Sequence, residues 1–162
     1  MCRIADIAKY SISKAIDLKN ILGDEKYYMD FYKLNKLLYL AQGLMLKQYD
    51  KCLFKEDIYA YTCGPYIQEL EFIFKDWEYE PITTKYPYEI ELPQSIKEFL
   101  DNIIEKYGRY NKRELGITTK KQTPWRETYV PDEPEKIIDL KLIKEYFLQI
   151  NDLNEEIKNA QL

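Results

Sequence analysis

The sequence predicts a mainly α-helical protein, a compact single-domain helical bundle with a small two-stranded β element over residues 1–162. Apolar residues recur at helical spacing in several segments, most densely in the run KLNKLLYLAQG at residues 33–43. Residues that favour β-structure alternate in one short run, at residues 57–63. A length of 162 residues is that of one domain, and we find no internal repeat or flexible linker.

The first helix is expected over residues 4–21. Its apolar residues fall on one face at intervals of three and four: Ile4, Ile7, Ala8, Ile12, Ala15 and Ile16. Gly23 follows and is a suitable residue to end the helix.

The second helix, over residues 30–49, is expected at the centre of the domain. Its apolar stripe consists of Leu34, Leu37, Leu38, Ala41, Leu44 and Met45, and Phe31, Tyr39 and Leu40 broaden it. A helix that is apolar over so much of its circumference is usually buried. Gly43 costs about 1 kcal/mol relative to alanine inside a helix, so we expect a neighbour to pack closely against it.

A short strand is expected over residues 57–63. We expect Gly64-Pro65 to end this strand and to begin the next helix, because proline is tolerated at the first helical position. Gly64 is expected to have a positive φ or to lie in a crowded turn. The run at residues 88–92, flanked by prolines, is expected as an ordered loop or as an edge strand, which could pair with residues 57–63.

The second half of the chain contains several signals for helix boundaries. Ser95 and Glu98 fit a capping box before a helix that ends at Tyr107, with Gly108 as the stop. Asn111 and Glu114 fit a second capping box.

Two further helices are expected towards the C-terminus. Thr123 is expected as the N-cap of one helix, with Pro124 in its first turn. One last helix is expected after Asp139, with Ile143, Tyr146, Phe147, Ile150, Leu153 and Ile157 on one side.

The composition argues against several classes of active site. The chain has no histidine, which excludes Ser-His and Cys-His nucleophile pairs and histidine-containing zinc sites. Cys2, Cys52 and Cys63 are widely spaced and form no C-x-x-C pair, as is typical of reduced thiols. The chain contains no run of about 20 apolar residues, which is the length needed to cross a bilayer. We therefore expect a cytoplasmic protein that is not an enzyme and that needs no cofactor or metal.

The charge is distributed unevenly along the chain. The whole chain carries −4, whereas residues 106–126 hold seven basic residues against Glu114 alone, a local charge of +6. Such a segment can dock an acidic partner or bind phosphate, or it can be a solvated surface whose charges pair internally. The overall pI of about 5.1 does not favour a nucleic-acid-binding protein, although a single basic face can suffice.

An ordered set of short motifs resembles a known family. The run KLLYLAQG at residues 36–43 is followed by Leu53-Phe54, Ile58, Ala60 and Gly64-Pro65, and later by Tyr107-Gly108, Leu115, Thr118, Pro124-Trp125 and Tyr146-Phe147. In order and spacing, the set resembles the Panacea domain, also called the SocA-like or phage GepA-like domain, over nearly the whole chain. The resemblance implies a mainly helical antitoxin that neutralises a cognate protein toxin by direct contact. Family members often have Thr-His before the Pro-Trp turn, whereas this chain has Thr118-Thr119.

The residues that we expect to contact a partner combine the basic segment with nearby aromatic and polar residues. Trp125 is assigned either to the core or to an interface, and Tyr39 is expected to need a partner for its hydroxyl, which Gln42 could supply. The candidates are Tyr39, Gln42, Tyr66, Arg109, Lys112, Arg113, Lys120, Lys121, Trp125 and Arg126. Two alternatives remain open: a phage- or prophage-encoded inhibitor of another host protein, and a nucleic-acid-binding regulator that uses residues 106–126. The oligomeric state is also left open.

Overall fold

The computed structural model describes residues 1–77, 80–86 and 90–162, which form eight α-helices and one two-stranded antiparallel sheet. The predicted fold class is therefore confirmed. The α-helices are α1 (Ile4–Leu22), α2 (Phe31–Tyr49), α3 (Gln68–Phe74), α4 (Gln94–Tyr107), α5 (Lys112–Lys121), α6 (Thr123–Thr128), α7 (Leu140–Leu148) and α8 (Leu153–Ala160). The strands are β1 (Tyr59–Tyr61) and β2 (Gly64–Tyr66), and two short 3₁₀ turns are η1 (Glu25–Tyr27) and η2 (Lys75–Trp77).

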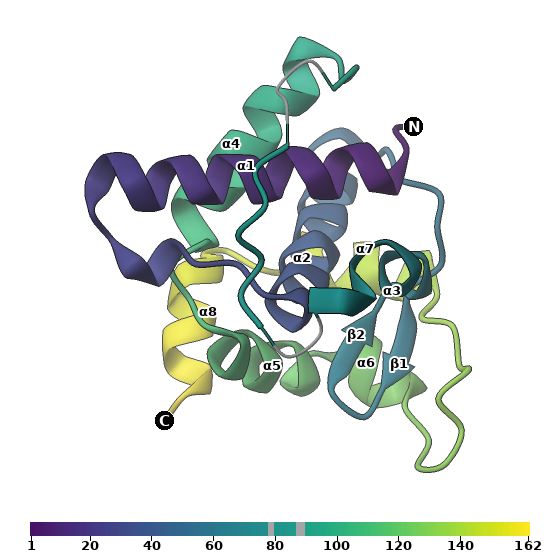
Figure 1. The fold of residues 1–162 in the computed structure, drawn as a ribbon. Coiled ribbons are helices and arrows are strands. Elements are labelled where there is room, and N and C mark those ends of the chain that lie inside the picture. The colour runs from purple at the N-terminus through teal and green to yellow at the C-terminus, as the bar shows by residue number, and fades with distance from the viewer. Residues whose placement is uncertain (78–79, 87–89) are drawn as a thin grey trace.

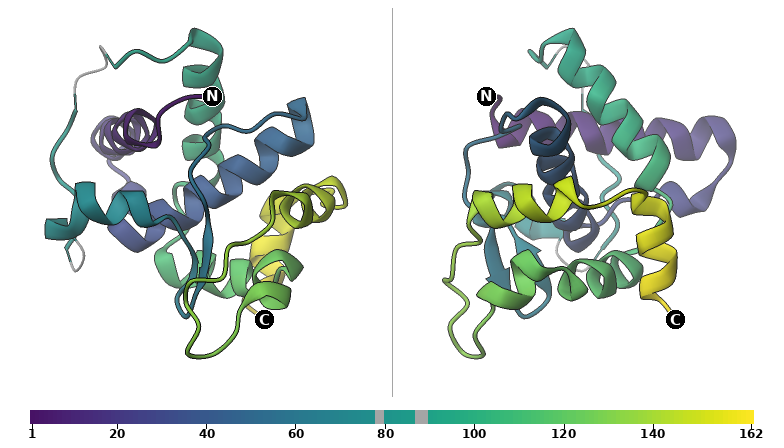
Figure 2. Two further views of the ribbon diagram at one scale, coloured as in Figure 1. Left: turned by 90° about the vertical axis from the view of Figure 1, so that its right-hand side faces the viewer. Right: turned by 180° about the vertical axis from the view of Figure 1, so that it is seen from behind.

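Helix α2 runs through the centre of the molecule, and the other elements surround it (Figure 1). It contacts α1 and α4 on one side, and α5, α7 and β2 on the others. Seen from behind, α7 lies in front of the central helix, α8 stands to its right, and α5 lies below α7 (Figure 2). Fifteen of the 19 residues of α2 are buried, so the prediction of a central helix is confirmed.

Both ends of α2 are defined by aspartates. The side chain of Asp30 accepts a hydrogen bond of 2.8 Å from the backbone amide of Lys33, as expected for an N-cap. At the other end, Asp50 adopts the left-handed conformation with φ 53°. Helix α1 ends in the same conformation at Gly23, with φ 63°, so the predicted stop is confirmed.

The polar side chains at the start of α2 are buried and bind backbone groups of neighbouring segments. The Lys33 ammonium donates to the carbonyls of Lys26 (3.0 Å) and Tyr28 (2.7 Å). The Asn35 side chain accepts a 2.7 Å hydrogen bond from the amide of Ile67, just before α3. Because buried backbone groups need hydrogen-bond partners, these contacts attach the flanking loops to the central helix.

In the second half of α2, the buried side chains of Gln42 and Tyr39 likewise form hydrogen bonds with other segments of the chain. Gln42 donates to the carbonyl of Phe54 (2.9 Å) and accepts from the amide of Leu53 (2.7 Å). The Tyr39 hydroxyl donates to Gln122 Oε1 at 2.7 Å. The prediction that Gln42 could serve Tyr39 is therefore wrong, because the loop at residues 53–54 occupies Gln42.

Gly43 allows α7 to pack directly against α2. A Cβ atom at this position would lie 2.4 Å from the ring of Phe147, a side chain with no exposed surface. The expected close neighbour of Gly43 is thus confirmed, and it is an aromatic ring from a helix about 100 residues further along the chain.

The β element differs from the prediction. Gly64 and Pro65 do not begin a helix but form β2, and α3 begins at Gln68. Gly64 has φ +120°, which confirms the expected positive φ and lets the chain reverse at Thr62-Cys63 so that Tyr61 faces Gly64. Proline is tolerated in β2 because, within the described part of the chain, this strand pairs with β1 alone.

The possible pairing of residues 88–92 with the first strand falls partly outside the described residues, at Tyr88 and Glu89. Among the described residues, β1 pairs with β2, and Tyr59 forms an additional bridge with Ile137. The second strand of the sheet is therefore the one that follows β1 directly.

The predicted helix starts are correct in part. At Asn111 the capping box is present: the amide of Glu114 donates to Asn111 (2.8 Å), and the amide of Asn111 donates to Glu114 (3.0 Å). The predicted box at Ser95 is wrong, because α4 begins at Gln94 and its N-cap is Pro93, two residues before the predicted N-cap. Thr123 is the first residue of α6 and Gln122 is its N-cap, a difference of one residue.

The single helix predicted after Asp139 is two helices, α7 and α8. Asp139 caps α7 as expected, but the chain leaves the helix after Leu148 and Asp152 caps a second helix. The break turns the chain, so that Phe147 and Ile157 are both fully buried although they lie on different helices. The apolar periodicity continued across the break and hid it.

We predict that Gly43→Ala destabilises the protein, because the new methyl group collides with the buried Phe147 ring. Overpacking of a core costs about 1–3 kcal/mol, which exceeds the gain of about 1 kcal/mol in helix propensity. Thermal or urea unfolding measures the change. Gly116→Ala on α5 is the control: the nearest atom is 3.9 Å away, so this variant should be neutral or more stable. Equal effects of the two substitutions would contradict the close packing.

We predict that Lys33 makes stability depend on pH above neutrality. Burial lowers the pKa of Lys33 from 10.5 to about 8, and the Asp30 carboxylate offsets part of this effect. The unfolded chain therefore holds the proton between pH 8 and 10, where the folded chain releases it, so stability rises with pH in this window. The unfolding free energy of the wild type should gain about 2 kcal/mol over Lys33→Met from pH 8 to 10. A constant difference between the two proteins would contradict the lowered pKa.

Candidate functional site

The hairpin formed by β1 and β2 presents a surface of aromatic rings bordered by lysines, which we call the hairpin face. Its residues come from the hairpin, from α5, and from α6 with the residue that follows it. They are Tyr61, Thr62, Cys63, Lys112, Lys120, Trp125 and Tyr129. The hairpin and α6 lie side by side in Figures 1 and 2, so residues about 60 positions apart form one surface.

Trp125 attaches α6 to the hairpin. Its indole nitrogen donates a 2.8 Å hydrogen bond to the carbonyl of Tyr61, and 9% of its surface is exposed. The Tyr129 ring stacks on the indole with 4.5 Å between the ring centroids. Lys120 also contacts this group. Its ammonium lies 5.7 Å from the centroid of the Trp125 ring and donates a 3.3 Å hydrogen bond to the carbonyl of Thr62. Trp125 is thus an anchor of the face, with its partly exposed partner Tyr129 above it.

A second stack lies on the hairpin itself. The rings of Tyr61 and Tyr66 are nearly parallel, with centroids 4.2 Å apart and an interplanar angle of 8°. Tyr66 is buried against Phe31 of the central helix, whereas Tyr61 is partly exposed. Burial raises the pKa of Tyr66, so its hydroxyl stays protonated. The hairpin face therefore has a rigid aromatic foundation that continues into the core.

Behind the turn of the hairpin, Lys36 of α2 meets Gly64 and Thr119. A Cβ atom on Gly64 would lie 3.1 Å from Lys36 Cε and 3.3 Å from Thr119 Oγ1. Thr119 is fully buried, and its hydroxyl donates to the carbonyl of Leu115 (2.9 Å). At the position where the family resemblance leads one to expect histidine, the chain thus has a compact side chain that closes its own hydrogen bond within α5.

The Lys36 ammonium is buried, and no described residue lies within hydrogen-bonding geometry of it. Burial lowers the pKa of Lys36, and the neighbouring Cys63 thiol offsets this effect in part. The ammonium also lies 5.6 Å from the centroid of the Tyr32 ring, which Lys112 approaches from the surface at 5.8 Å. This arrangement places two lysines beside one tyrosine ring at the edge of the hairpin face.

The basic segment at residues 106–126 does not form one continuous patch. Arg109 pairs at 2.8 Å with Asp24, the residue directly before η1. Lys121 donates to the carbonyl of Ala160 at the end of α8 (2.6 Å). Lys112 and Lys120 are eight residues apart on α5, with Gly116 between them next to the carbonyl of Cys63. Part of the +6 charge is therefore used in contacts within the protein, and two lysines border the hairpin face.

The remaining candidates divide between the surface and the interior. Arg113 and Arg126 are exposed. Tyr39 and Gln42 have no exposed surface, and Tyr66 exposes 6%, so these three side chains support the fold from inside. Burial raises the pKa of Tyr39 well above its ordinary value, and its hydroxyl remains a hydrogen-bond donor.

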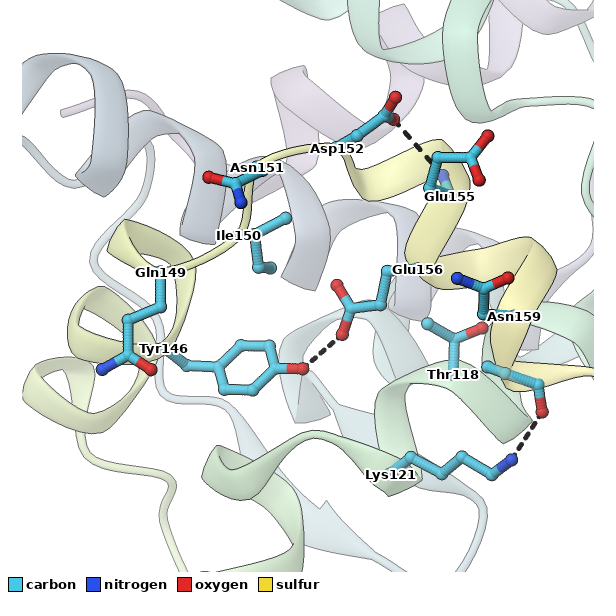
Figure 3. Close-up of a pocket in the computed structure, with 11 residues that line it drawn as sticks. Thr118, Lys121, Tyr146, Gln149, Ile150, Asn151, Asp152, Glu155, Glu156 and Asn159 are labelled. Carbon is cyan, nitrogen blue, oxygen red and sulfur yellow. Dashed lines mark hydrogen bonds between the residues drawn. The ribbon is translucent and has the colours of Figure 1, made fainter.

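A polar pocket opens on another side of the protein, between the ends of α5, α7 and α8 (Figure 3). The side chains of Tyr146 and Glu156 face each other in it and are hydrogen-bonded. Gln122 also donates to Glu156 Oε1, at 3.3 Å. Because Tyr39 binds the same glutamine, a chain of hydrogen bonds runs from the central helix to this pocket.

The sequence did not indicate Tyr61 and Tyr129 of the hairpin face or the pocket residue Glu156 as site residues. Tyr61 and Tyr129 lie in aromatic-rich segments, but nothing in their spacing shows that Trp125 connects them. Glu156 lies on the inner side of α8, next to Ile157. An acidic residue at a core-facing position of an amphipathic helix is the signal that could have identified it.

The described residues contain no group of three histidine, cysteine, aspartate or glutamate side chains that could hold a metal ion. Within the same ranges, no helix has the length and apolarity needed to cross a membrane. The aromatic rings and lysines of the hairpin face are residue types that often contact another molecule.

Comparison with known proteins identifies the family. The model of the family described as "Antitoxin SocA-like, Panacea domain" matches residues 34–126, which include most of α2, the hairpin, α5 and Trp125. No curated protein and no solved structure matches the chain. Because the family match covers more than half of the 162 residues, the chain belongs to the SocA-like antitoxins of the Panacea domain family.

Proposed function

We propose that this protein is the antitoxin of a toxin–antitoxin pair and that it neutralises a cognate protein toxin by binding it directly through the hairpin face. The observation that carries the proposal is the family match, because it spans the elements that build this face. Of the face's seven residues, six lie inside the matched range and Tyr129 lies three residues beyond it.

The chemistry of the hairpin face is typical of a protein-binding surface. Tryptophan and tyrosine supply most of the binding energy in many interfaces, and they lose little conformational entropy when they are already held in place. Here the hydrogen bond of Trp125 to Tyr61 and the two ring stacks hold the aromatic groups before a partner arrives. Lys112 and Lys120 at the border favour a partner with acidic groups around an apolar centre.

The proposal assigns no catalytic step to this chain, in line with the absence of histidine from its sequence. Neutralisation then requires one antitoxin for each toxin, and the toxin is inactive while its active site or substrate path is covered. We further propose that the pair acts in the cytoplasm.

Two other functions are alternatives to this proposal. An inhibitor of another host protein, encoded by a phage or prophage, would bind through the same aromatic rings and lysines. A nucleic-acid-binding regulator would instead use the positive charge of residues 106–126. The internal contacts of Arg109 and Lys121 reduce the charge that is free for phosphate and favour a protein partner.

We predict that Lys112→Glu combined with Lys120→Glu weakens neutralisation. The two substitutions replace attraction of acidic groups by repulsion, and the dissociation constant for the toxin should rise at least ten-fold, about 1.4 kcal/mol. The toxin to use is the product of the reading frame next to the gene. Growth rescue on co-expression and the affinity of the purified pair are the two measurements.

The control is Lys51→Glu combined with Lys55→Glu, two exposed lysines before β1 that undergo the same change of charge. This variant should neutralise like the wild type, and both variants should keep their thermal stability. Equal loss in the two double variants would refute the hairpin face as the contact surface. If the wild type neither rescues growth nor co-purifies with the neighbouring product, the antitoxin proposal fails. A mobility shift of DNA or RNA that disappears with salt would then favour the regulator.

A further inference from the structure

The polar pocket between α5, α7 and α8 is separate from the hairpin face and has the properties of a binding site for a cation. It has a volume of about 760 Å³, within the range of small-molecule sites. The loop between α7 and α8 forms one wall, and the last turn of α5 and one side of α8 form the others (Figure 3). Its acidic lining residues are Asp152, Glu155 and Glu156.

Glu156 is the central group of this pocket, and one of its oxygens is unused. Oε1 accepts hydrogen bonds from the Tyr146 hydroxyl and from Gln122 Nε2. Oε2 exposes less than 1 Å² to solvent and has no hydrogen-bond partner among the described residues. A buried carboxylate oxygen without a donor costs free energy. Because solvent does not reach Oε2 as the side chain stands, a ligand can supply the missing donor only when the Glu156 carboxylate turns toward the pocket.

The side chains around Glu156 add negative charge, whereas the helix dipoles act in both directions. The last turns of α5 and α7 bring their negative ends to the pocket, but Asp152 caps α8 and Glu155 and Glu156 lie in its first turn, at the positive end. Lys121 is the one basic residue of the lining, and its ammonium is already bound to the carbonyl of Ala160. Arg126 acts on Tyr146 from α6, outside the lining. The pocket therefore carries more negative than positive charge.

The donors and acceptors of the pocket suit an organic cation better than a metal ion. Within the described ranges, no three acidic side chains come close enough together to hold a metal. A guanidinium group has five N–H donors in a plane, so it can bind a carboxylate such as that of Glu156 and several neighbouring oxygens at once. Gln149, Asn151 and Asn159 supply amide oxygens around the pocket.

We propose that this pocket binds a guanidinium group, with the Glu156 carboxylate, turned toward the pocket, as its main acceptor. The proposal rests on the proposed function in one respect: the guanidinium is then an arginine side chain of the toxin, which makes the pocket a second contact point apart from the hairpin face. A free small guanidine compound has the same chemistry, and a titration of the complex separates the two sources.

The test is an NMR titration of the isolated protein with N-acetyl-arginine N-methylamide. A single anchoring group is expected to bind with a dissociation constant on the order of 1–10 mM. Backbone signals of Tyr146, Gln149–Asp152 and Glu156 should shift. The matched probe is the citrulline counterpart, which has the same shape without the charge and should bind at least ten-fold more weakly. No shift with the arginine probe, equal shifts with both probes, or shifts elsewhere on the protein would overturn the proposal.

Two variants assign the effect to Glu156. Glu156→Gln preserves the shape of the side chain, removes its charge and should weaken the arginine probe at least ten-fold. Glu145→Gln removes the same charge from an exposed residue of α7 outside the pocket, and should have no effect. If both variants lose affinity for the arginine probe to a similar extent, binding depends on the overall charge of the protein, and the proposal is overturned. If Glu156→Gln does not fold, the comparison of the arginine and citrulline probes on the wild type decides whether the pocket binds a guanidinium group.

The complex with the toxin identifies the source of the guanidinium. If the toxin supplies it, the arginine probe no longer shifts the pocket signals in the complex, and Glu156→Gln weakens the complex. If the ligand is a free guanidine compound, the probe binds the complex and the free protein alike. Both results support a guanidinium pocket. Because the titration needs no toxin, its failure leaves the antitoxin proposal standing, and failure of growth rescue leaves the pocket standing.

Discussion

The structure depends on one buried helix that holds its surroundings by polar contacts. Helix α2 packs its apolar residues against α1, α4, α5 and α7, but its position relative to the loops is defined by Lys33, Asn35, Tyr39 and Gln42. Each of these side chains forms a hydrogen bond with a polar group of a neighbouring segment that lies outside the regular helices and strands. Apolar packing is not directional, whereas these hydrogen bonds specify which loop lies at which position along the helix. The loops between α1 and α2, after α2 and before α3 are therefore attached to the same rigid element.

The same helix connects the two candidate binding regions. Tyr39 reaches Gln122, which precedes α6 and the Trp125 anchor of the hairpin face, and Gln122 reaches Glu156 in the pocket. Phe31, at the start of α2, supports the Tyr66 and Tyr61 stack from below. Both regions thus rest on residues that are buried and hydrogen-bonded. A binding surface on such a support loses little conformational entropy on association, which is useful for a protein that acts by stoichiometric binding.

The elements that could be predicted from the sequence are those with local signals. The apolar stripe of α2, the left-handed Gly23 and the capping box of Asn111 depend on residues within one or two helical turns, and all three are present. Gly43 and Gly64 were correctly interpreted, because glycine destabilises a helix interior unless a neighbour needs the space, and at a turn it permits a positive φ. The errors arose where a local signal competed with a distant contact. Gly64-Pro65 resembles a helix start but pairs with β1, and the apolar periodicity after Asp139 conceals the break between α7 and α8.

By itself, the sequence determined the helical class, the central position of α2, the absence of histidine chemistry and a family resemblance that the comparison confirmed. The tertiary structure alone decided which charges of the basic segment remain free, that Gln122 and not Gln42 serves Tyr39, and that Trp125 joins the hairpin. It also decided that Glu156 has an oxygen without a partner in a pocket. The physical reason is the range of the interactions. Propensities and caps act between neighbouring residues, whereas the hydrogen bonds and ion pairs that decide these points join residues about 30 to 85 positions apart. Single-sequence patterns contain no information about such pairs.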